Sequence, residues 1–511
     1  MTGLSLLVFL PAIGAGALLF IPRRAASFLF SAALAVSSLA FLQCLWIFAR
    51  FDPNVADMQF VERAAWIPAY GIEYIVGVDG VSLFLILLTA LMVPVAILAS
   101  WTIHDKVKEY VFFMLVLETG MLGTLVALDL FLFYVFWEVM LVPMYFLIGV
   151  WGGQRRLYAA VKFVIYTMTG SLLMLVAIIF LATRNYQVTQ TLTFNFHQLA
   201  NLRLPFHEQI WLFSAFALSF AIKVPLFPLH TWLPDAHVEA PTAGSVILAA
   251  ILLKMGTYGF IRFAIPLFPE AALAAAPYII ALAVVGIIYG AMVAMMQDDL
   301  KKLVAYSSVS HLGFVTLGLF VFNLQGAEGA VYQMLNHGVS TGALFLIVGM
   351  LYDRRHTRMI ADFGGLWKQV PLLSAVFLLV TFSSIGLPGL NGFVGEFLIL
   401  LGAFQASPAW AALAATGVVL GAMYMLWMLR RVVFGPLARP ENRTLKDMSA
   451  REIALMAPLV ALIVFMGVYP QPFLSRMKGS ARTALARVQS QTLAAPVVRA
   501  EPAAMESKRE R

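Results

Sequence analysis

Residues 223–263 read KVPLFPLHTWLPDAHVEAPTAGSVILAAILLKMGTYGFIRF and place two lysines, Lys223 and Lys254, in strongly apolar surroundings. Three prolines follow the first lysine: Pro225, Pro228 and Pro234. Proline removes a backbone donor and clashes with the preceding turn, so a helix cannot stay regular here. The second lysine lies about half-way along an apolar run that is long enough to cross a membrane. We therefore predict a broken helix, followed by a membrane helix with a buried lysine.

The whole chain is apolar in the same way. Of its 511 residues, 61% are hydrophobic and 12% are charged, whereas a soluble domain has about 45–50% apolar and about 25% charged residues. Too few polar side chains remain to cover a surface that faces water, so we expect a membrane protein in contact with lipid. The net charge of +8 does not indicate nucleic-acid binding, because membrane proteins concentrate Lys and Arg in their cytoplasmic loops.

Counting apolar runs of about 20 residues predicts an all-α polytopic membrane protein with about 14 transmembrane helices. The first run has no basic region before it, so we expect a retained helix and not a cleaved signal peptide. A tail beyond residue 475, rich in Ala, Arg, Ser and Glu, is expected to be mobile or draped on the surface. The helices are expected near 3–21, 27–49, 80–101, 110–128, 130–151, 158–181, 210–231, 242–263, 271–296, 303–322, 328–351, 371–404, 410–430 and 452–469.

The basic residues predict the orientation, because cytoplasmic loops carry the excess of Lys and Arg. With both termini in the periplasm of a bacterial inner membrane, the outer loops hold only Arg50, Arg63, Arg184 and Arg203. The inner loops hold the other loop cations: Arg23, Arg24, Lys106, Lys108, Arg155, Arg156, Lys301, Lys302, Arg354, Arg355, Arg358, Lys368 and those of 430–451. The basic tail departs from this rule.

Five ionisable residues fall deep inside predicted helices: Glu118, Glu138, Lys223, Lys254 and Glu396. Each costs at least about 2.5–3.5 kcal/mol at the bilayer centre, and such residues commonly mark ion or proton routes. A buried lysine can release and recapture a proton, and a nearby carboxylate opposes that release. The alternative is a scaffold in which these charges only hold helices together.

Other residues are weaker candidates. Lys162 and Arg262 lie where a long side chain reaches the membrane interface, and Asp129 begins a helix, where a capping carboxylate is common. His311 and His337 have serines nearby and can relay protons, since a neutral imidazole both donates and accepts. Hydrogen bonds that join helices are the alternative role for these histidines.

A second helix break is predicted in TFSSIGLPGLNGFVGEFLIL, residues 381–400, shortly before Glu396. Two interrupted helices, each beside a buried charge, are typical of inverted-repeat transporters. The predicted division is 1–105 for helices 1–3, 106–265 for a first five-helix repeat, 266–435 for an inverted second repeat, 436–475 for helix 14 and 476–511 for the basic tail.

Four stretches carry a resemblance to a known family: LDLFLFYVFWEVMLVPMYFLIGVWGG (residues 128–153), the opening stretch at 223–263, DLKKLVAYSSVSHLGFV (299–315) and GLPGLNGFVGEF (386–397). In this order they resemble the antiporter-like subunits of respiratory NADH:quinone oxidoreductase, complex I, and most of all its chain M. The resemblance covers about residues 70–470 and implies fourteen helices with two inverted five-helix units.

The resemblance also implies roles for six residues. Glu138 matches the pump carboxylate of helix 5, Lys223 and Lys254 match the lysines of helices 7 and 8, and Glu396 matches the terminal residue of broken helix 12. His311 and His337 match positions in the connecting hydrated path. A glutamate at 396 is typical of chain M, whereas chains L and N and the multisubunit cation/proton antiporters have lysine there.

No cofactor or metal site is expected in this chain, which has one cysteine, Cys44, and neither a GxGxxG loop nor a phosphate loop. The resemblance implies that NADH, FMN, iron–sulfur clusters and quinone bind to partner subunits. It implies chains L and N and small membrane chains as neighbours. A Na⁺/H⁺ antiporter component and a subunit of a related hydrogenase or photosynthetic complex are the alternatives.

Overall fold

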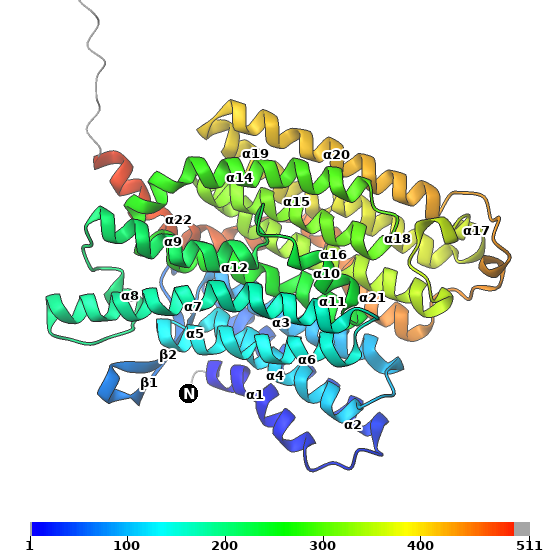
Figure 1. Cartoon of the computed structure of the whole chain (residues 1–511), viewed down its shortest axis with the longest axis horizontal. Coiled ribbons are helices and arrows are strands. Elements are labelled where there is room, and N and C mark those ends of the chain that lie inside the picture. Colours follow the sequence, from blue (N-terminus) through cyan, green and yellow to red (C-terminus); the bar gives the residue numbers. More distant parts are fainter. Residues whose placement is uncertain (1–2, 495–511) are drawn as a thin grey trace, which may run out of the picture.

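The computed structural model describes residues 3–494, and long helices that lie side by side along one axis make up most of it (Figure 1). Eleven helices of this part are long and apolar enough to cross a membrane. They are α2 (Ala26–Arg50), α3 (Gly80–Ala99, extended to Thr102), α4 (Val107–Val126), α5 with α6 (Leu130–Val139 and Leu141–Trp151), α7 (Arg156–Thr189), the helix from α11 to α13 (Thr242–Leu267), α14 (Pro269–Met295), α15 (Leu300–Phe320), α16 (Leu324–Arg355), α20 (Pro408–Val432) and α21 (Ala450–Val468).

Shorter helices lie at the other expected positions. The first is α1 (Leu4–Leu18), and α9 (Phe206–Lys223) leads to α10 (Trp232–Glu239). The expected helix at 371–404 is divided into α18 (Pro371–Ser384) and α19 (Asn391–Ala406). Each of the fourteen predicted positions therefore holds helix, whereas eleven meet the length and composition of a continuous span. The difference lies in the short first helix and in the two breaks.

Both helix breaks follow from backbone chemistry. After α9 ends at Lys223, the carbonyl of Ile222 accepts a hydrogen bond from the Trp232 indole at 2.9 Å, so a side chain satisfies a carbonyl next to the break. At the second break, Gly386 and Gly389 have φ values of +76° and +92°. These left-handed conformations favour glycine because it has no Cβ.

A β-hairpin makes the expectation of an all-α fold wrong in one region. Strands β1 (Gln59–Ile67) and β2 (Ile72–Val78) pair antiparallel beside the bundle. A short 3₁₀ turn and Gly71, at φ +66°, connect them. Counting long apolar runs missed the hairpin because β1 has charged residues among its apolar ones, and a strand needs only alternate apolar positions.

A helix also replaces much of the expected mobile tail. Helix α22 (Gln471–Ala494) packs against α3, α13, α14 and α16. Its buried residues Met477, Ala481 and Leu485 are four positions apart, so they form one apolar stripe. Of the two expectations for the tail, the structure agrees with a segment that lies against the bundle up to residue 494. The helix itself was not predicted, because its apolar stripe lies among basic residues. Residues 495–511 of the predicted tail lie outside the described residues.

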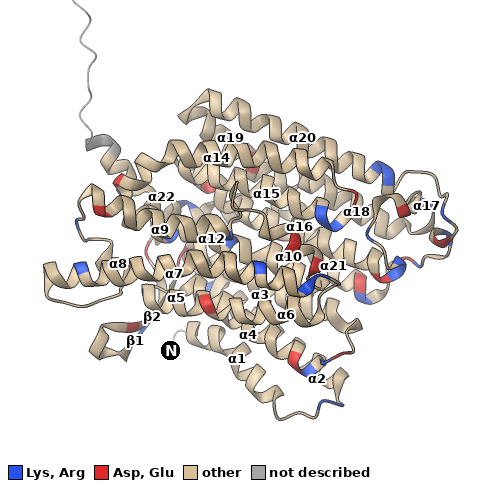
Figure 2. Ribbon diagram, viewed as in Figure 1, with Lys and Arg blue, Asp and Glu red and all other residues tan. Residues whose placement is uncertain are grey.

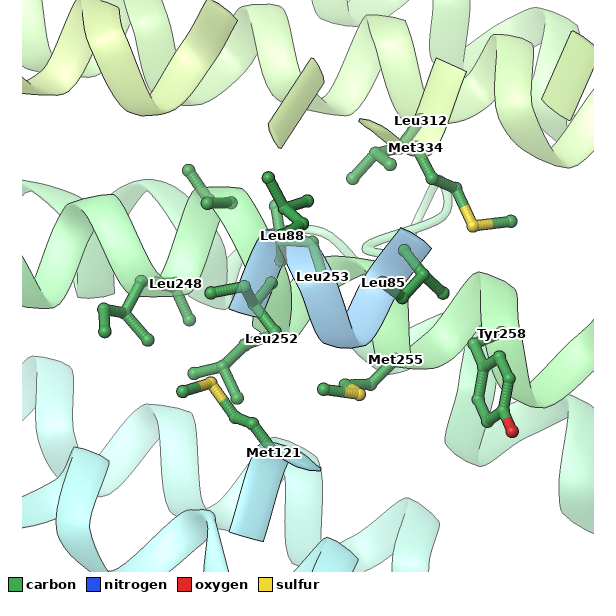
Figure 3. Packing of buried hydrophobic residues seen from close by; sticks show 14 of the residues in the cluster. Leu85, Leu88, Met121, Leu248, Leu252, Leu253, Met255, Tyr258, Leu312 and Met334 are labelled. Atoms are coloured by element: carbon green, nitrogen blue, oxygen red, sulfur yellow. The ribbon is translucent and has the colours of Figure 1, made fainter. Parts of the chain in front are cut away.

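The interior around Lys254 is apolar and tightly packed. Figure 3 shows Leu252, Leu253 and Met255 surrounded by side chains from neighbouring helices, among them Leu85, Leu88, Met121, Leu312 and Met334. The helix here is not uniform: two π-helical segments, η3 (Leu248–Leu252) and η4 (Phe260–Ala264), flank α12 (Leu253–Gly259). Such π segments frequently occur at functional sites.

The charged residues gather at one end of the bundle. Figure 2 shows Lys and Arg concentrated around α17 (Leu366–Gln369) and the neighbouring helix ends, and few charges among the central helices. We call this the basic end. The opposite end carries the hairpin and α22 (Figure 1).

Candidate functional site

Lys254 and His337 are in direct contact inside the bundle. The Lys254 ammonium nitrogen lies 2.6 Å from Nδ1 of His337 and also donates to the Ala249 carbonyl of the π-helical segment η3. Lys254 is 1% exposed and His337 is 3% exposed, so water does not surround the pair. Helices α12 and α16 thus bring together two groups that can exchange a proton.

Glu396 has a contact of the same kind with the other histidine. Its Oε1 lies 2.9 Å from Nδ1 of His311 and accepts a hydrogen bond from Gln333 Nε2 at 3.1 Å. Asn336 donates to Gln333 Oε1 at 2.9 Å, which fixes the orientation of the Gln333 amide. Helices α15, α16 and α19 therefore position the carboxylate of Glu396.

The two pairs lie next to each other. The rings of His311 and His337 have centroids 5.8 Å apart, and Nε2 of each ring has no hydrogen-bond partner among residues 3–494. Both line a cavity of about 10 Å³ together with Ser340 and Thr341, and a water molecule needs roughly that much free volume. Lys254, His337, His311 and Glu396 therefore form a chain with one short gap, which a single water can bridge.

The nearby hydroxyls divide into two groups. Ser340 and Thr341 line the cavity, and Ser340 hydrogen-bonds Ser383 at 2.6 Å across the second helix break. Ser307, Ser308 and Ser310, in contrast, donate to backbone carbonyls of Val304 and Ile287. Ser310 therefore joins α15 to α14, whereas Ser307 and Ser308 bond within α15.

The second break brings backbone close to Glu396. A Cβ on Gly386 would lie 3.0 Å from Oε2 of Glu396, and a Cβ on Gly392 would lie 2.0 Å from the Ser383 carbonyl. Glycine is therefore required for this approach. Oε1 of Glu396 therefore faces His311, and Oε2 faces the irregular backbone at Gly386.

Glu138 and Lys223 do not form an ion pair in this conformation: no oxygen of Glu138 lies within 4.0 Å of the Lys223 ammonium in the described structure. The ammonium instead lies over the rings of Trp137, at 5.3 Å, and Phe163, at 5.5 Å. Ring faces attract a cation, which explains how the lysine stays buried. Glu138 is half-buried and close enough to attract Lys223 electrostatically.

Among the weaker candidates, Arg262 is buried within the described structure. It forms a buried ion pair with Asp79, the capping residue of α3, and also donates to the Tyr258 hydroxyl. Sequence reasoning missed Asp79, although the Asp-Gly-Val-Ser order at 79–82 matches a capping pattern. This pair holds α3 against the helix that carries Lys254.

The other three weaker candidates lie apart from the relay. Lys162 pairs with Asp235 at 2.7 Å near the surface. Asp129 caps α5 by accepting from Phe131 and Leu132, and burial raises the pKa of Asp129 to about 6. Glu118 is fully buried, and neither of its oxygens has a hydrogen-bond partner within residues 3–494.

Gln333 was missed by sequence reasoning, although it lies one helical turn before His337.

Comparisons with known proteins agree with this architecture. Residues 127–423 match the family model described as NADH:quinone oxidoreductase/Mrp antiporter, and residues 18–128 match NADH-ubiquinone oxidoreductase chain 4, amino terminus. The chain is 48% identical to NADH-quinone oxidoreductase subunit M of Rhodobacter capsulatus, over 91% of this chain and 93% of that one. It is 45% identical to NADH-ubiquinone oxidoreductase chain 4 of Marchantia polymorpha, over 94% and 96%.

A solved structure is similar over nearly the whole chain. It is a chain of respiratory complex I from Thermus thermophilus with bound NADH, with a TM-score of 0.86 and 34% identity. The match covers 95% of this chain and 99% of that one.

Proposed function

Because this chain belongs to the family of NADH:quinone oxidoreductase subunit M and its mitochondrial counterpart, chain 4, we propose that its buried lysine, histidine and glutamate side chains form a proton route. The protein is a multi-pass membrane subunit of respiratory complex I, a proton-translocating enzyme. The proposal assigns the proton route to particular residues of this chain.

The observation that carries the proposal is the chain of contacts from Lys254 to Glu396. A proton on the Lys254 ammonium passes to Nδ1 of His337, 2.6 Å away. The imidazolium then releases the proton on Nε2, through one water, to Nε2 of His311, and His311 passes the proton on Nδ1 to Glu396, 2.9 Å away. Each imidazole takes up one proton and gives up another, so it ends neutral.

In this proposal, Glu138 and Lys223 control when Lys254 gives up its proton. The buried Lys223 cation faces two aromatic rings here and is attracted by Glu138. Movement of this cation away from Glu138 and towards Lys254 disfavours a second positive charge and drives the proton of Lys254 along the route. The driving signal comes from quinone reduction in another subunit.

The proposal also includes topology and partners. We propose fourteen crossings of a bacterial inner membrane, with repeats at 106–265 and 266–435 and both termini in the periplasm, so that the basic end is cytoplasmic. Chains L and N and small membrane chains are the proposed neighbours, together with lipid. NADH, FMN, the iron–sulfur clusters and quinone bind to other subunits in this proposal.

Lys254→Arg tests the proton route. Arginine keeps the charge but stays protonated in practice, so we expect proton pumping by the complex in membrane vesicles to be lost in large part. NADH oxidation by an artificial acceptor should stay normal, because this step does not depend on the proton route. Lys302→Arg, at an exposed position, is the matched control. Normal pumping by Lys254→Arg contradicts the proposal.

A further inference from the structure

Two side-chain amides of α16 connect Glu396 to the small cavity that the two histidines line. Nε2 of Gln333 donates to Oε1 of Glu396 at 3.1 Å, and Nδ2 of Asn336 donates to Oε1 of Gln333 at 2.9 Å. Gln333 is 2% exposed and Asn336 is 1% exposed, and both line the cavity of about 10 Å³ together with His311 and His337. We call Gln333 and Asn336 the amide pair.

The carboxylate of Glu396 determines how both amides are turned. An ionised carboxylate only accepts hydrogen bonds, so Gln333 turns its NH₂ group towards it. The Gln333 oxygen then accepts from Asn336, so Asn336 uses its own NH₂ group for this bond. Oδ1 of Asn336 is left over, and it has no hydrogen-bond partner among residues 3–494. The charge on Glu396 therefore decides which polar atom of Asn336 stays available.

This available oxygen completes a site for one water molecule. A buried water makes two to four hydrogen bonds, and three side-chain atoms of the cavity-lining residues have no partner among residues 3–494: Nε2 of His337, Nε2 of His311 and Oδ1 of Asn336. A water here accepts from the Nε2–H of His337, donates one hydrogen to Nε2 of His311 and donates the other to Oδ1 of Asn336. With these three partners, the water directs one hydrogen at the ring that receives the proton.

Helix α19 leaves room for the amide pair at a glycine. A Cβ on Gly395 would lie 2.4 Å from Oε1 of Gln333 and 2.7 Å from Nδ2 of Asn336. The residue before Glu396 must therefore be small if the pair is to keep this position. Gly395→Ala would displace the pair without removing a polar group, so it separates the position of the amides from their presence.

We propose that Gln333 and Asn336 are positioning residues that orient the water between the two histidines while Glu396 is ionised. This inference rests on the proposed proton route. The imidazolium of His337 gives its Nε2 proton to the oriented water, which gives another proton to Nε2 of His311, so the water is restored and the charge has moved by one ring. A protonated Glu396 can also donate, so it no longer fixes the amide pair. The pair thus orients the water when the acceptor at the end of the route is ready.

Asn336→Leu in the intact complex tests this role, because leucine has a similar volume but no hydrogen-bonding atom. We expect the initial rate of pumping in vesicles, normalised to NADH oxidation by an artificial acceptor, to fall several-fold. The ratio of the rates in H₂O and D₂O should rise, because an unoriented water makes proton transfer the slow step. A purely structural amide would lower the yield of assembled complex and leave this ratio unchanged. Gln325→Leu, which replaces a half-buried amide in the first turn of the same helix, is the matched control and should behave as the wild type.

Gln333→Leu provides a second variant, because it leaves Asn336 in place but without the group that turns it. Its pumping rate and isotope ratio should change as they do in Asn336→Leu, and Gly395→Ala should change them in the same direction. If both amides act on one water, their effects are not additive. The double variant Gln333→Leu/Asn336→Leu should then pump no more slowly than the slower single variant.

Several results would overturn the inference. These are wild-type pumping in either assembled single variant, a loss of pumping with an unchanged isotope ratio, and additive losses in the double variant. Failure of both single variants to assemble would also overturn it, because the amide pair would then be structural. If Lys254→Arg abolishes pumping while the amide variants pump normally, the proposed function stands and only this inference fails.

Discussion

At the scale of single residues, the partners of a buried charged group distinguish a structural ion pair from a group that can exchange protons. Arg262 and Asp79 form a buried ion pair, and Ser82 also donates to Asp79, so their charges are satisfied within the structure. In contrast, His337 and His311, which contact Lys254 and Glu396, each have one ring nitrogen without a hydrogen-bond partner among residues 3–494, and both line a water-sized cavity. Unsatisfied buried groups are costly, and a route that uses them in turn is the physical reason to keep them.

Substitutions of Glu396 can distinguish a carboxylate with a structural role from one that takes up and releases protons. Glu396→Gln keeps a side chain of the same shape that can still hydrogen-bond His311, but it cannot take up a proton. Glu396→Asp and Glu396→Lys remain titratable. We expect proton uptake by vesicles containing the complex to be lower with Gln than with Asp or Lys. If Gln matches the wild type while the complex assembles, Glu396 is a structural ligand and protons leave elsewhere.

The Arg262–Asp79 pair leads to the opposite expectation. Asp79→Asn leaves a buried cation without its counter-charge, and breaking such a pair costs about 3–5 kcal/mol in the free energy of unfolding. The thermal unfolding temperature or the yield of assembled complex should fall, while pumping per assembled complex stays close to normal. Glu73→Gln, which breaks the exposed pair with Arg63, should change stability by no more than about 1 kcal/mol. A large pumping defect in well-assembled Asp79→Asn would place this pair in the route.

At the level of elements, the helix breaks place irregular backbone beside buried charges: Lys223 at the first break and Glu396 at the second. Lys223 ends α9, and Glu396 lies in the second turn of α19 after its break. Helix α12 is flanked by two π-helical segments, and the Ala249 carbonyl of one of them accepts a hydrogen bond from Lys254. Irregular backbone at these three places positions each of the buried charges.

Gly386 provides a test of the second break, with Gly389 as its matched control. Both have positive φ, so alanine at either position costs roughly 1–2 kcal/mol of backbone strain. A Cβ at 386 would also lie 3.0 Å from Glu396 Oε2, whereas a Cβ at 389 would meet nothing within 4 Å. We expect Gly386→Ala to reduce pumping more than Gly389→Ala at similar thermal stability. Equal effects would mean that strain alone matters and that the break does not position Glu396.

At the scale of the whole molecule, the two ends of the bundle differ in charge and in shape. Loops rich in Lys and Arg occupy the basic end (Figure 2), where three cavities of about 240, 180 and 370 Å³ also lie. The hairpin and α22 occupy the other end (Figure 1). Arg487 of α22 donates to the carbonyl of Ala200 and to Asn201 at that other end, so the C-terminal helix is held there.

The proposed orientation predicts which loops each side of the membrane can reach. The one native cysteine, Cys44, is buried, so single cysteines introduced at exposed positions report sidedness. A membrane-impermeant maleimide added to intact cells that lack an outer membrane should label Gln190→Cys and Arg482→Cys. Lys446→Cys should react only after the cells are opened. Labelling of all three from the same side would refute the topology.

The sequence by itself determined the class of the protein, the positions of its helices and both helix breaks. These features depend on local chemistry: the length of an apolar run, the missing N–H of proline and the positive φ that glycine permits. The resemblance of the sequence to a known family also pointed to the residues that we propose for the proton route. A count of long apolar runs missed the hairpin because its strands are only nine and seven residues long. It missed α22 because that helix buries a narrow apolar stripe among polar residues.

Only the tertiary structure decided which of these residues meet. Lys254 contacts His337 across 83 positions and His311 contacts Glu396 across 85, whereas Lys223 faces aromatic rings and not Glu138. The sequence contains all six residues, but their contacts depend on how helices cross and which rotamers the packing allows. Those distances arise from the whole bundle, because no local pattern specifies how far apart two side chains on different helices lie.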